Sequence, residues 1–331
     1  MAGCRLRSGF VFGIIPSDCN LIGLFIRIGI LLKLISIGEV LWDVVGETEY
    51  LGGAPLNVAA HTARLGHAVS IISAVGTDQR GSKALSQIRA LGISAEYIAS
   101  LPEYCTGYAS VTLRDDGQPR FVIHRPAAYD FAEVTDNQVE QLAGLGPSWV
   151  YFGTLAQTSS VIRSTTTRVI NAVPHAKRFY DVNLRENSFD RATVSHLLGS
   201  ATITKLNDGE VSLLENLLSD RHHKSIEDAC RTWASRFGWE GACVTRGSEG
   251  CALLIGDDYV ESPGYSVSVV DAIGAGDAFA AALMHALHMD WDAKRAADFA
   301  NRLGALVASR AGAIPTWGLS ELDALVPQSS V

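Results

Sequence analysis

Short apolar runs of strand character alternate with stretches of helical periodicity along most of the chain, and this alternation restricts its fold more than any other feature. Strand-like runs occur at 34–41, 69–75, 149–152, 179–182, 203–206 and 242–244. Helical spacing occurs at 56–65, 81–91, 161–173, 194–198, 211–218, 226–237 and 275–287. Alternating strands and helices form βαβ units, whose right-handed crossovers place helices on both faces of a mostly parallel sheet. We therefore predict an α/β fold with three α/β/α layers.

Composition and charge exclude several classes of protein. Of the 331 residues, 47% are hydrophobic and 19% are charged, so the chain can bury a large core. The net charge of −8 and the lack of long basic blocks disfavour a nucleic-acid partner. No uncharged apolar run reaches the ~20 residues that a membrane span needs. The six cysteines form no C-x-x-C pair, which favours free thiols in a reducing compartment. We therefore expect a cytoplasmic protein without nucleic-acid or membrane partners.

The first 36 residues differ from the rest of the chain in charge. Arg5, Arg7, Arg27 and Lys33 oppose Asp18 there, so this segment is basic although the whole chain is acidic. We interpret residues 1–33 as an atypical N-terminal extension and residues 34–326 as the folded domain. A targeting segment is the alternative interpretation of the extension.

Two stretches interrupt the alternation of strands and helices. Residues 107–113 and 119–124 flank an Asp116-Gly117 turn signal, which is typical of a β-hairpin. Short strands within 41–56 and 104–127 predict a small β-sheet that projects from the core. Such a sheet can form a lid over the carboxyl ends of parallel strands, where α/β proteins bind ligands. Its open edges could also pair with a second copy, so a homodimer through the lid is a candidate assembly.

The segment most suggestive of chemistry is rich in small residues. A strand-like run at 265–270 precedes it, and helical spacing follows it. Residues 274–276 would thus lie at a helix N-terminus, where backbone N–H groups and the helix dipole favour an anion such as a phosphate. Asp277 follows in the first turn. A carboxylate there either complements the helix dipole or accepts a proton from a hydroxyl that attacks a phosphate.

The segment Asp271–Phe279 resembles the C-terminal signature of the ribokinase/PfkB family of carbohydrate kinases, D-T-x-G-A-G-D, with Ala272 in place of the usual Thr. Residues 51–66 resemble the family's glycine-glycine…asparagine turn with its following helix, and Gly76-x-Asp78-x-x-Gly81 also matches. The similarity extends from about residue 34 to about residue 317. P-loop, dinucleotide-binding and protein-kinase motifs do not occur. The resemblance implies a ribokinase-like three-layer α/β/α core with a small β-sheet lid.

The resemblance also implies roles for individual residues. Asp277 would be the base that deprotonates the sugar hydroxyl. The anion hole would be Gly274, Ala275 and Gly276, and the sugar-binding residues would be Asp43, Gly53, Asn57, Arg125 and Arg185. By residue type alone, Asp43 also suits a turn, Asn57 a helix N-cap and the two arginines surface ion pairs.

On the nucleotide side, the family's N-x-x-E motif matches Asn207 and Glu210, which follow Lys205. In the family this motif organises Mg²⁺ and phosphate through water, which suits an ion that keeps several waters. The further matches for ATP binding are Thr245, Gly247 and Gly250 in a T-x-G-x-x-G turn, and Asn301 near the adenine. A helix cap at 207–210 and an ordinary hairpin turn at 245–250 are the alternatives.

Residues 38–43, 121–128 and 181–185 most resemble fructokinase-like members of the family. The resemblance therefore implies a kinase that uses ATP and Mg²⁺ to phosphorylate fructose. K⁺ is a further candidate cofactor, with carbonyls around Asp271, Ile273 and Gly312 as candidate ligands. The alternatives are a kinase for 2-keto-3-deoxygluconate, ribose or a nucleoside, and a catalytically silent sensor of sugar or nucleotide. The intact Asp277 opposes the silent sensor.

Overall fold

The computed structural model describes residues 31–113, 119–186, 188–220 and 222–327. We predict an N-terminal extension over residues 1–33, and residues 1–30 of it lie outside the described residues. Leu32 is fully buried, and its backbone N–H donates to His67 Nδ1 at 3.3 Å. The packed part of the chain therefore begins no later than residue 32.

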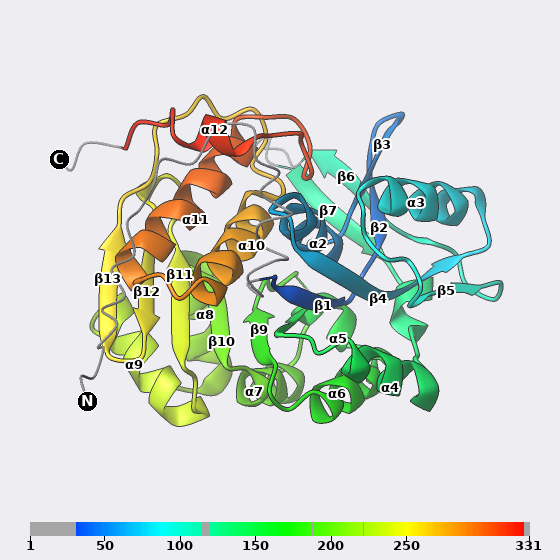
Figure 1. Ribbon diagram of the computed structural model, residues 1–331, viewed down its shortest axis with the longest axis horizontal. Coiled ribbons are helices and arrows are strands. Elements are labelled where there is room, and N and C mark those ends of the chain that lie inside the picture. The colour runs from blue at the N-terminus through cyan, green and yellow to red at the C-terminus, as the bar shows by residue number, and fades with distance from the viewer. Residues whose placement is uncertain (1–30, 114–118, 187, 221, 328–331) are drawn as a thin grey trace, which may run out of the picture.

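The main sheet has nine strands in the order β13-β12-β11-β10-β9-β8-β1-β4-β5 (Figure 1). Their bounds are β1 Lys33–Ile37, β4 Ala68–Gly76, β5 Ile98–Leu101, β8 Trp149–Gly153, β9 Lys177–Asp181, β10 Ile203–Asn207, β11 Gly241–Thr245, β12 Cys251–Ile255 and β13 Asp258–Ser262. Every neighbouring pair from β5 to β11 is parallel, whereas β12 and β13 are added antiparallel. The predicted mostly parallel sheet is confirmed.

Helices cover both faces of this sheet (Figure 1). One layer holds α2 Ala54–Arg64, α3 Gln79–Ala90, α10 Ala275–His288 and α11 Ala293–Ala308, with the short α12 Leu319–Leu322 beside α11. The other holds α4 Asp136–Gly144, α5 Thr154–Gln157, α6 Ser160–Ala172, α7 Arg191–Ser200, α8 Asp208–Leu218 and α9 Ile226–Phe237. Side chains alternate between the two cores: in β8, Trp149 and Tyr151 face the first layer, and Val150 and Phe152 the second. The predicted three layers are confirmed.

Four further strands form a small separate sheet in the order β3-β2-β6-β7. They are β2 Leu41–Val45, β3 Thr48–Gly52, β6 Gly107–Leu113 and β7 Pro119–His124. Asp43 in β2 pairs with Ala109 in β6, and Ala109 pairs with Ile123 in β7, so these residues form one row across the sheet. The predicted hairpin pairs β6 with β7, while its turn at 114–118 lies outside the described residues. The small sheet stands beside the main sheet, near α3 (Figure 1).

Two predicted strands differ from those observed. The run at 34–41 is split: β1 ends at Ile37, and Leu41 already belongs to the small sheet. The break falls at Gly38, which has a φ of +152° and approaches Pro55 so closely that a Cβ would lie 2.5 Å from its Cγ. The run at 265–270 is not a strand, since only Tyr265 forms an isolated bridge, with Pro327. The residue types of this run favour a strand, but the main sheet ends at β13 and the run does not pair with it.

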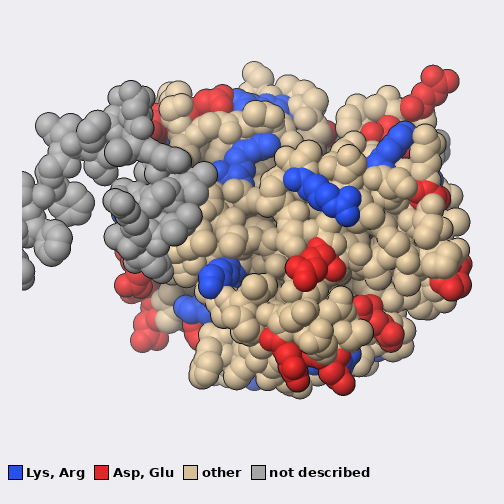
Figure 2. All heavy atoms as spheres, turned by 45° about the vertical axis from the view of Figure 1, so that its right-hand side comes forward, with Lys and Arg blue, Asp and Glu red and all other residues tan. Residues whose placement is uncertain are grey.

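Surface charge, helix polarity and cysteine burial further characterise the fold. On the face in Figure 2, basic and acidic side chains are interspersed among uncharged ones. In the described part of the chain, every helix is too short or too polar to cross a membrane. The cysteines of that part are free thiols, of which Cys230, Cys243 and Cys251 are buried and Cys105 is exposed.

Asp78 fastens the start of α3 to the segment that leads into β6. Its Oδ1 accepts from the Gly81 N–H at 2.8 Å and from Thr106 Oγ1 at 2.7 Å, and its Oδ2 accepts from the Thr106 N–H at 2.8 Å. Burial would raise the pKa of Asp78, but these hydrogen bonds outweigh it and lower the pKa. The Asp78 motif residue thus has a clear structural role.

We predict that Asp78→Ala lowers the free energy of unfolding by about 2–3 kcal/mol, because it removes a helix cap and leaves the donors of Thr106 without their acceptor. Chemical denaturation measures the change. Ser86→Ala, at an exposed position of the same helix, is the control and should change stability by less than ~0.5 kcal/mol. Equal effects of the two substitutions would contradict the prediction.

Candidate active site

A cavity of about 450 Å³ lies between the carboxyl ends of the main-sheet strands and the small sheet. Parallel strands direct their following loops to this edge, so residues far apart in the sequence meet there. The predicted site residues that line it are Asp43, Gly53, Asn57, Arg185, Lys205, Asn207, Thr245, Gly274, Gly276 and Asp277. Ala275 lies between two of them, as the first residue of α10. The structure therefore brings most of the predicted site residues together around one cavity.

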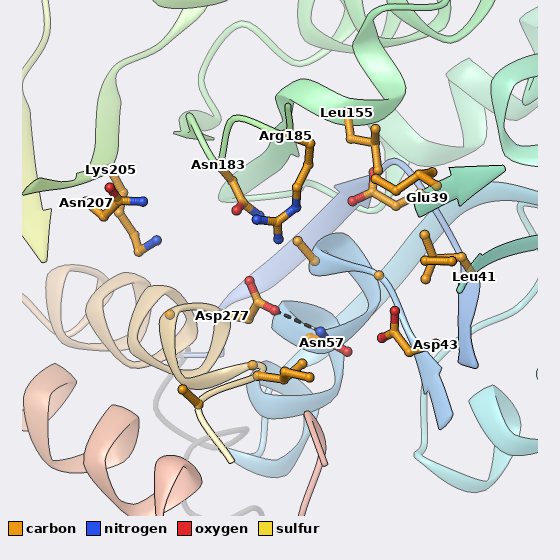
Figure 3. Close-up of a pocket in the computed structure, with 18 of the residues that line it drawn as sticks. Glu39, Leu41, Asp43, Asn57, Leu155, Asn183, Arg185, Lys205, Asn207 and Asp277 are labelled. Carbon is orange, nitrogen blue, oxygen red and sulfur yellow. Dashed lines mark hydrogen bonds between the residues drawn. The ribbon is translucent and has the colours of Figure 1, made fainter. Parts of the chain in front are cut away.

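Asp277 occupies the middle of this site (Figure 3). On one side lies the glycine end, which we define by Lys205, Asn207 and the 274–276 segment. On the other lies the lid end, defined by Glu39, Leu41, Asp43 and Arg185. Both ends line the same cavity.

The Asp277 carboxylate belongs to the first turn of α10 and is 9% exposed. Its Oδ2 accepts from Asn57 Nδ2 at 2.8 Å, which joins the first turns of α10 and α2. Burial raises the pKa of Asp277 to about 6, and the Asp181 charge adds to this effect. The Asn57 hydrogen bond and the charges of Lys205 and Arg185 act in the opposite direction. Asp277 is therefore a buried carboxylate that can gain or lose a proton near neutral pH.

Gly274 caps α10 in a conformation that favours glycine. Its φ is +79°, and a Cβ there would lie 2.5 Å from the Ala313 carbonyl oxygen. Asp271 holds the same region together: its Oδ1 accepts from the Ile273 N–H at 2.9 Å and its Oδ2 from the Gly312 N–H at 3.1 Å. The three segments named as K⁺ candidates are thus adjacent, and the K⁺ site itself stays a prediction.

The lid end is rich in buried acceptor atoms. Burial raises the pKa of Glu39 to about 7 and that of Asp43 to about 6, while the nearby Arg185 charge lowers both. Glu39 Oε2 and Asn57 Oδ1 are buried and have no hydrogen-bond partner among the described residues. Gly53 allows this packing, since a Cβ there would lie 2.4 Å from the Glu39 carbonyl oxygen. A ligand that donates hydrogen bonds would satisfy these acceptors.

Asn207 and Glu210 form a capping box at the start of α8. Asn207 Oδ1 accepts from the Glu210 N–H and Glu210 Oε2 from the Asn207 N–H, both at 2.9 Å. Glu210 Oε1 accepts from the Leu184 N–H at 2.7 Å. The capping alternative is therefore what the geometry shows, while binding of Mg²⁺ through water stays a prediction.

Among the described residues, no three or more His, Cys, Asp or Glu side chains gather to hold a metal ion. The side-chain oxygens of Asn207 and Glu210 fit an Mg²⁺ ion that arrives on nucleotide phosphates and keeps its waters.

Arg125 is not brought into the cavity lining of the described residues. Its Nε donates to Asp130 Oδ2 at 3.2 Å, and its Nη1 donates to the Leu155 carbonyl at 2.9 Å and also to Thr158. Its Nη2 completes an ion pair with Asp130. Arg125 thus fastens the end of β7 to the core, in the manner of the ion-pair alternative.

Gly250 and Asn301 also lie away from the cavity, and both contact the segment after β13. A Cβ on Gly250 would lie 2.1 Å from the Ser262 carbonyl oxygen, and Asn301 Nδ2 donates to the Ser262 and Pro263 carbonyls at 3.2 Å each. Gly247 belongs to a short 3-10 turn with a φ of +54°. Gly250 and Asn301 therefore support the segment that leads toward α10.

Sequence reasoning missed three residues of the site. Glu39 and Asn183 line the cavity, and Asp181 holds Lys205 from behind it. Each follows or ends a buried strand, at the edge where ligands bind in α/β folds. That position was a usable signal for all three.

Comparison with known proteins decides the family. A family profile described as pfkB family carbohydrate kinase matches residues 26–318. This chain belongs to the pfkB family. Fructokinase-1 of Oryza sativa subsp. japonica is 30% identical over 283 residues, 80% of this chain and 84% of the rice protein. The fructokinase of Escherichia coli is 28% identical over 301 residues, 85% of this chain and 95% of that protein.

A solved structure agrees with this assignment. A provisionally assigned ribokinase II from Escherichia coli, in complex with ATP and Mg²⁺, has a TM-score of 0.77 and 26% identity, covering 89% of this chain and 98% of that one. The predicted resemblance and the ribokinase-like fold are confirmed. As a pfkB family member, the protein is a carbohydrate kinase.

We predict that Gly274→Ala lowers stability by about 1–3 kcal/mol, because the new methyl group meets the Ala313 backbone and the positive φ is strained. Gly276→Ala is the matched control: its Cβ would lie 3.5 Å from its nearest neighbour, Lys205 Nζ. Thermal unfolding of the two variants measures the difference. A Gly274 variant as stable as the Gly276 variant would refute the steric argument.

Proposed function

We propose that this carbohydrate kinase transfers a phosphoryl group from ATP to a hydroxyl of a neutral sugar, fructose, with Asp277 as general base. One observation carries the proposal. The Asp277 carboxylate lies between the small-residue helix N-terminus at 274–276 and the acceptor-rich lid end of one cavity. A hydroxyl bound at the lid end and a phosphate bound at the glycine end would both meet it.

The charges of the lid end support a neutral polyol. Glu39 and Asp43 at the lid end and Asp277 beside it contribute three carboxylates, against the two cations of Arg185 and Lys205 in the same lining. An unpaired buried acceptor costs roughly 1–3 kcal/mol, which sugar hydroxyls can offset by donating to Glu39 Oε2 and Asn57 Oδ1. The carboxylate of 2-keto-3-deoxygluconate would meet a surplus of negative charge. The similarity to two fructokinases supports fructose among neutral sugars.

The proposed reaction assigns one task to each part of the cavity. Ionised Asp277 accepts the proton as the sugar oxygen attacks the terminal phosphate of ATP, and the oxygen that bridges to ADP leaves with the bond electrons. The N–H groups of Gly274, Ala275 and Gly276 stabilise the charge on the transferring group. Leu41, Ala109 and Ile123 of the small sheet limit water at the lid end.

Mg²⁺ belongs to the proposal as the partner of ATP. When bound, it would neutralise part of the phosphate charge. Asn207 and Glu210 would hold it through water, since each carboxylate oxygen of Glu210 can accept a second hydrogen bond besides its backbone donor. The ATP and Mg²⁺ complex of the Escherichia coli structure supports this pairing.

The charges of the lid end predict a substrate preference. With Mg-ATP, we expect ADP release with fructose to exceed that with 2-keto-3-deoxygluconate by at least ~100-fold in kcat/KM, because of the carboxylates at the lid end. Ribose, glucose and adenosine complete the panel, each with and without K⁺. Preference for the sugar acid would overturn the charge argument. Binding of ATP and fructose without ADP release would favour the silent sensor.

An isosteric substitution tests the proposed base. We expect Asp277→Asn to lower kcat by at least ~1,000-fold, because an amide cannot accept the proton. The variant should keep its fold and still stabilise on binding ATP. Asp290→Asn, just beyond the other end of α10, is the isosteric control and should keep wild-type turnover. Substantial turnover by the Asp277 variant would rule out its role as base.

A further inference from the structure

Lys205 and Asp181 form a buried ion pair at the glycine end of the cavity. Lys205 Nζ donates to both carboxylate oxygens of Asp181, at 3.0 Å each, and the two side chains are 8% and 1% exposed. The Tyr151 hydroxyl also donates to Asp181 Oδ2, at 3.3 Å. Among the described residues, Lys205 lines the cavity and Asp181 stands behind it. Asp181 can therefore act on a ligand only through Lys205 or through its charge.

The ammonium group lies beside the small-residue segment that begins α10. A Cβ added to Gly276 would stand 3.5 Å from Lys205 Nζ and 4.0 Å from its Cε. An anion bound by the N–H groups of residues 274–276 would therefore also meet this ammonium. A free lysine side chain samples many rotamers, and fixing it on a ligand costs conformational entropy. Contact with both Asp181 oxygens fixes it before any ligand binds.

We propose that Asp181 is a positioning residue that holds the Lys205 ammonium beside Gly276, where the phosphoryl group in transfer meets a fixed positive charge. The inference rests on the proposed function, because it takes residues 274–276 as the anion hole and Asp277 as the base. Charge that is already oriented toward a developing negative charge stabilises the transition state without reorganisation during the reaction.

The location of the pair favours this role over a stabilising one. Buried ion pairs add little net stability, because the cost of removing both charges from water offsets their attraction. This pair lies at the cavity wall. The ammonium group has three N–H donors, and it makes two hydrogen bonds to Asp181. A Cβ built on Gly276 would lie 3.5 Å from the ammonium nitrogen. A phosphate oxygen is the acceptor that this geometry suits.

Asp181 also acts on Asp277 through its charge. After burial, the Asp181 carboxylate is the largest influence that raises the pKa of Asp277 to about 6, and Lys205 and Arg185 oppose it. The other ionisable groups that face Asp277 are Tyr151 in β8 and Glu39 and Asp43 at the lid end. Replacing Asp181 by Asn removes a negative charge and leaves Lys205 unneutralised. Loss of the negative charge lowers the pKa of Asp277, and the Lys205 charge continues to act in the same direction, so the pH below which the base is lost moves down.

The test compares the full chain with Asp181→Asn, Lys205→Met and the double variant, each with saturating Mg-ATP and fructose over the acid and neutral range. Asp181→Asn should lower kcat about 10- to 100-fold with little change in the KM for fructose. Its acid midpoint should fall by at least about 0.5 pH units, and that of Lys205→Met should rise. With Met at position 205, Asp181→Asn should change kcat by less than about threefold.

Each outcome bears on the proposal. If Asp181→Asn keeps the wild-type kcat and midpoint while Asp277→Asn is inactive, the inference fails and the proposed function stands. If Asp277→Asn retains turnover, the base itself fails, and the inference with it. If Asp181→Asn does not fold, which thermal unfolding reports, the double variant decides, since it carries no unpaired buried ammonium. A large further loss of kcat relative to Lys205→Met would overturn the inference.

Discussion

Buried negative charge at the carboxyl edge of the main sheet is the constraint on which the cavity depends. Asp181, Glu210 and Asp277 are each 9% exposed or less. A carboxylate removed from water is stable only with nearby donors or a counter-charge. Lys205 compensates Asp181, the Asn57 amide contacts Asp277, and backbone N–H groups at the start of α8 and after β9 compensate Glu210. These contacts fix β9, β10 and α8 relative to one another, and α2 relative to α10.

Close approach of backbones makes this compensation geometrically feasible. Asn57 and Asp277 are 220 positions apart, and their short side chains meet only if α2 and α10 begin close together. Both helices are capped by glycines with positive φ, Gly53 at +111° and Gly274 at +79°. A side chain at either position would run into a carbonyl oxygen, of Glu39 or of Ala313. The two glycine signatures therefore bring the helix starts together.

The periodic patterns predict the layers and the strand direction well. A short stretch of sequence is enough to show whether one face of a helix or both faces of a strand are buried. Partners of charged side chains are set by tertiary contacts, and there prediction is weaker. Arg125 has the residue type and position of a ligand contact, yet it pairs with Asp130 across a five-residue separation. Glu39 lies in a segment that resembles fructokinase-like kinases, yet only its position after a buried strand marks it as a site residue. The run at 265–270 shows the opposite error, since β-branched residues without a neighbouring strand form none.

The two ends of the cavity differ in the sign of their electrostatic field, and Asp277 lies at the boundary. The glycine end combines the partial positive charge of a helix N-terminus with the Lys205 ammonium, which the surrounding carboxylates keep protonated. The lid end presents carboxylates whose pKa values are raised by burial. A phosphate at the lid end or a polyol at the glycine end would each leave buried groups unmatched. In the proposed reaction, this difference in charge sets the direction in which the sugar and the phosphate face each other across Asp277.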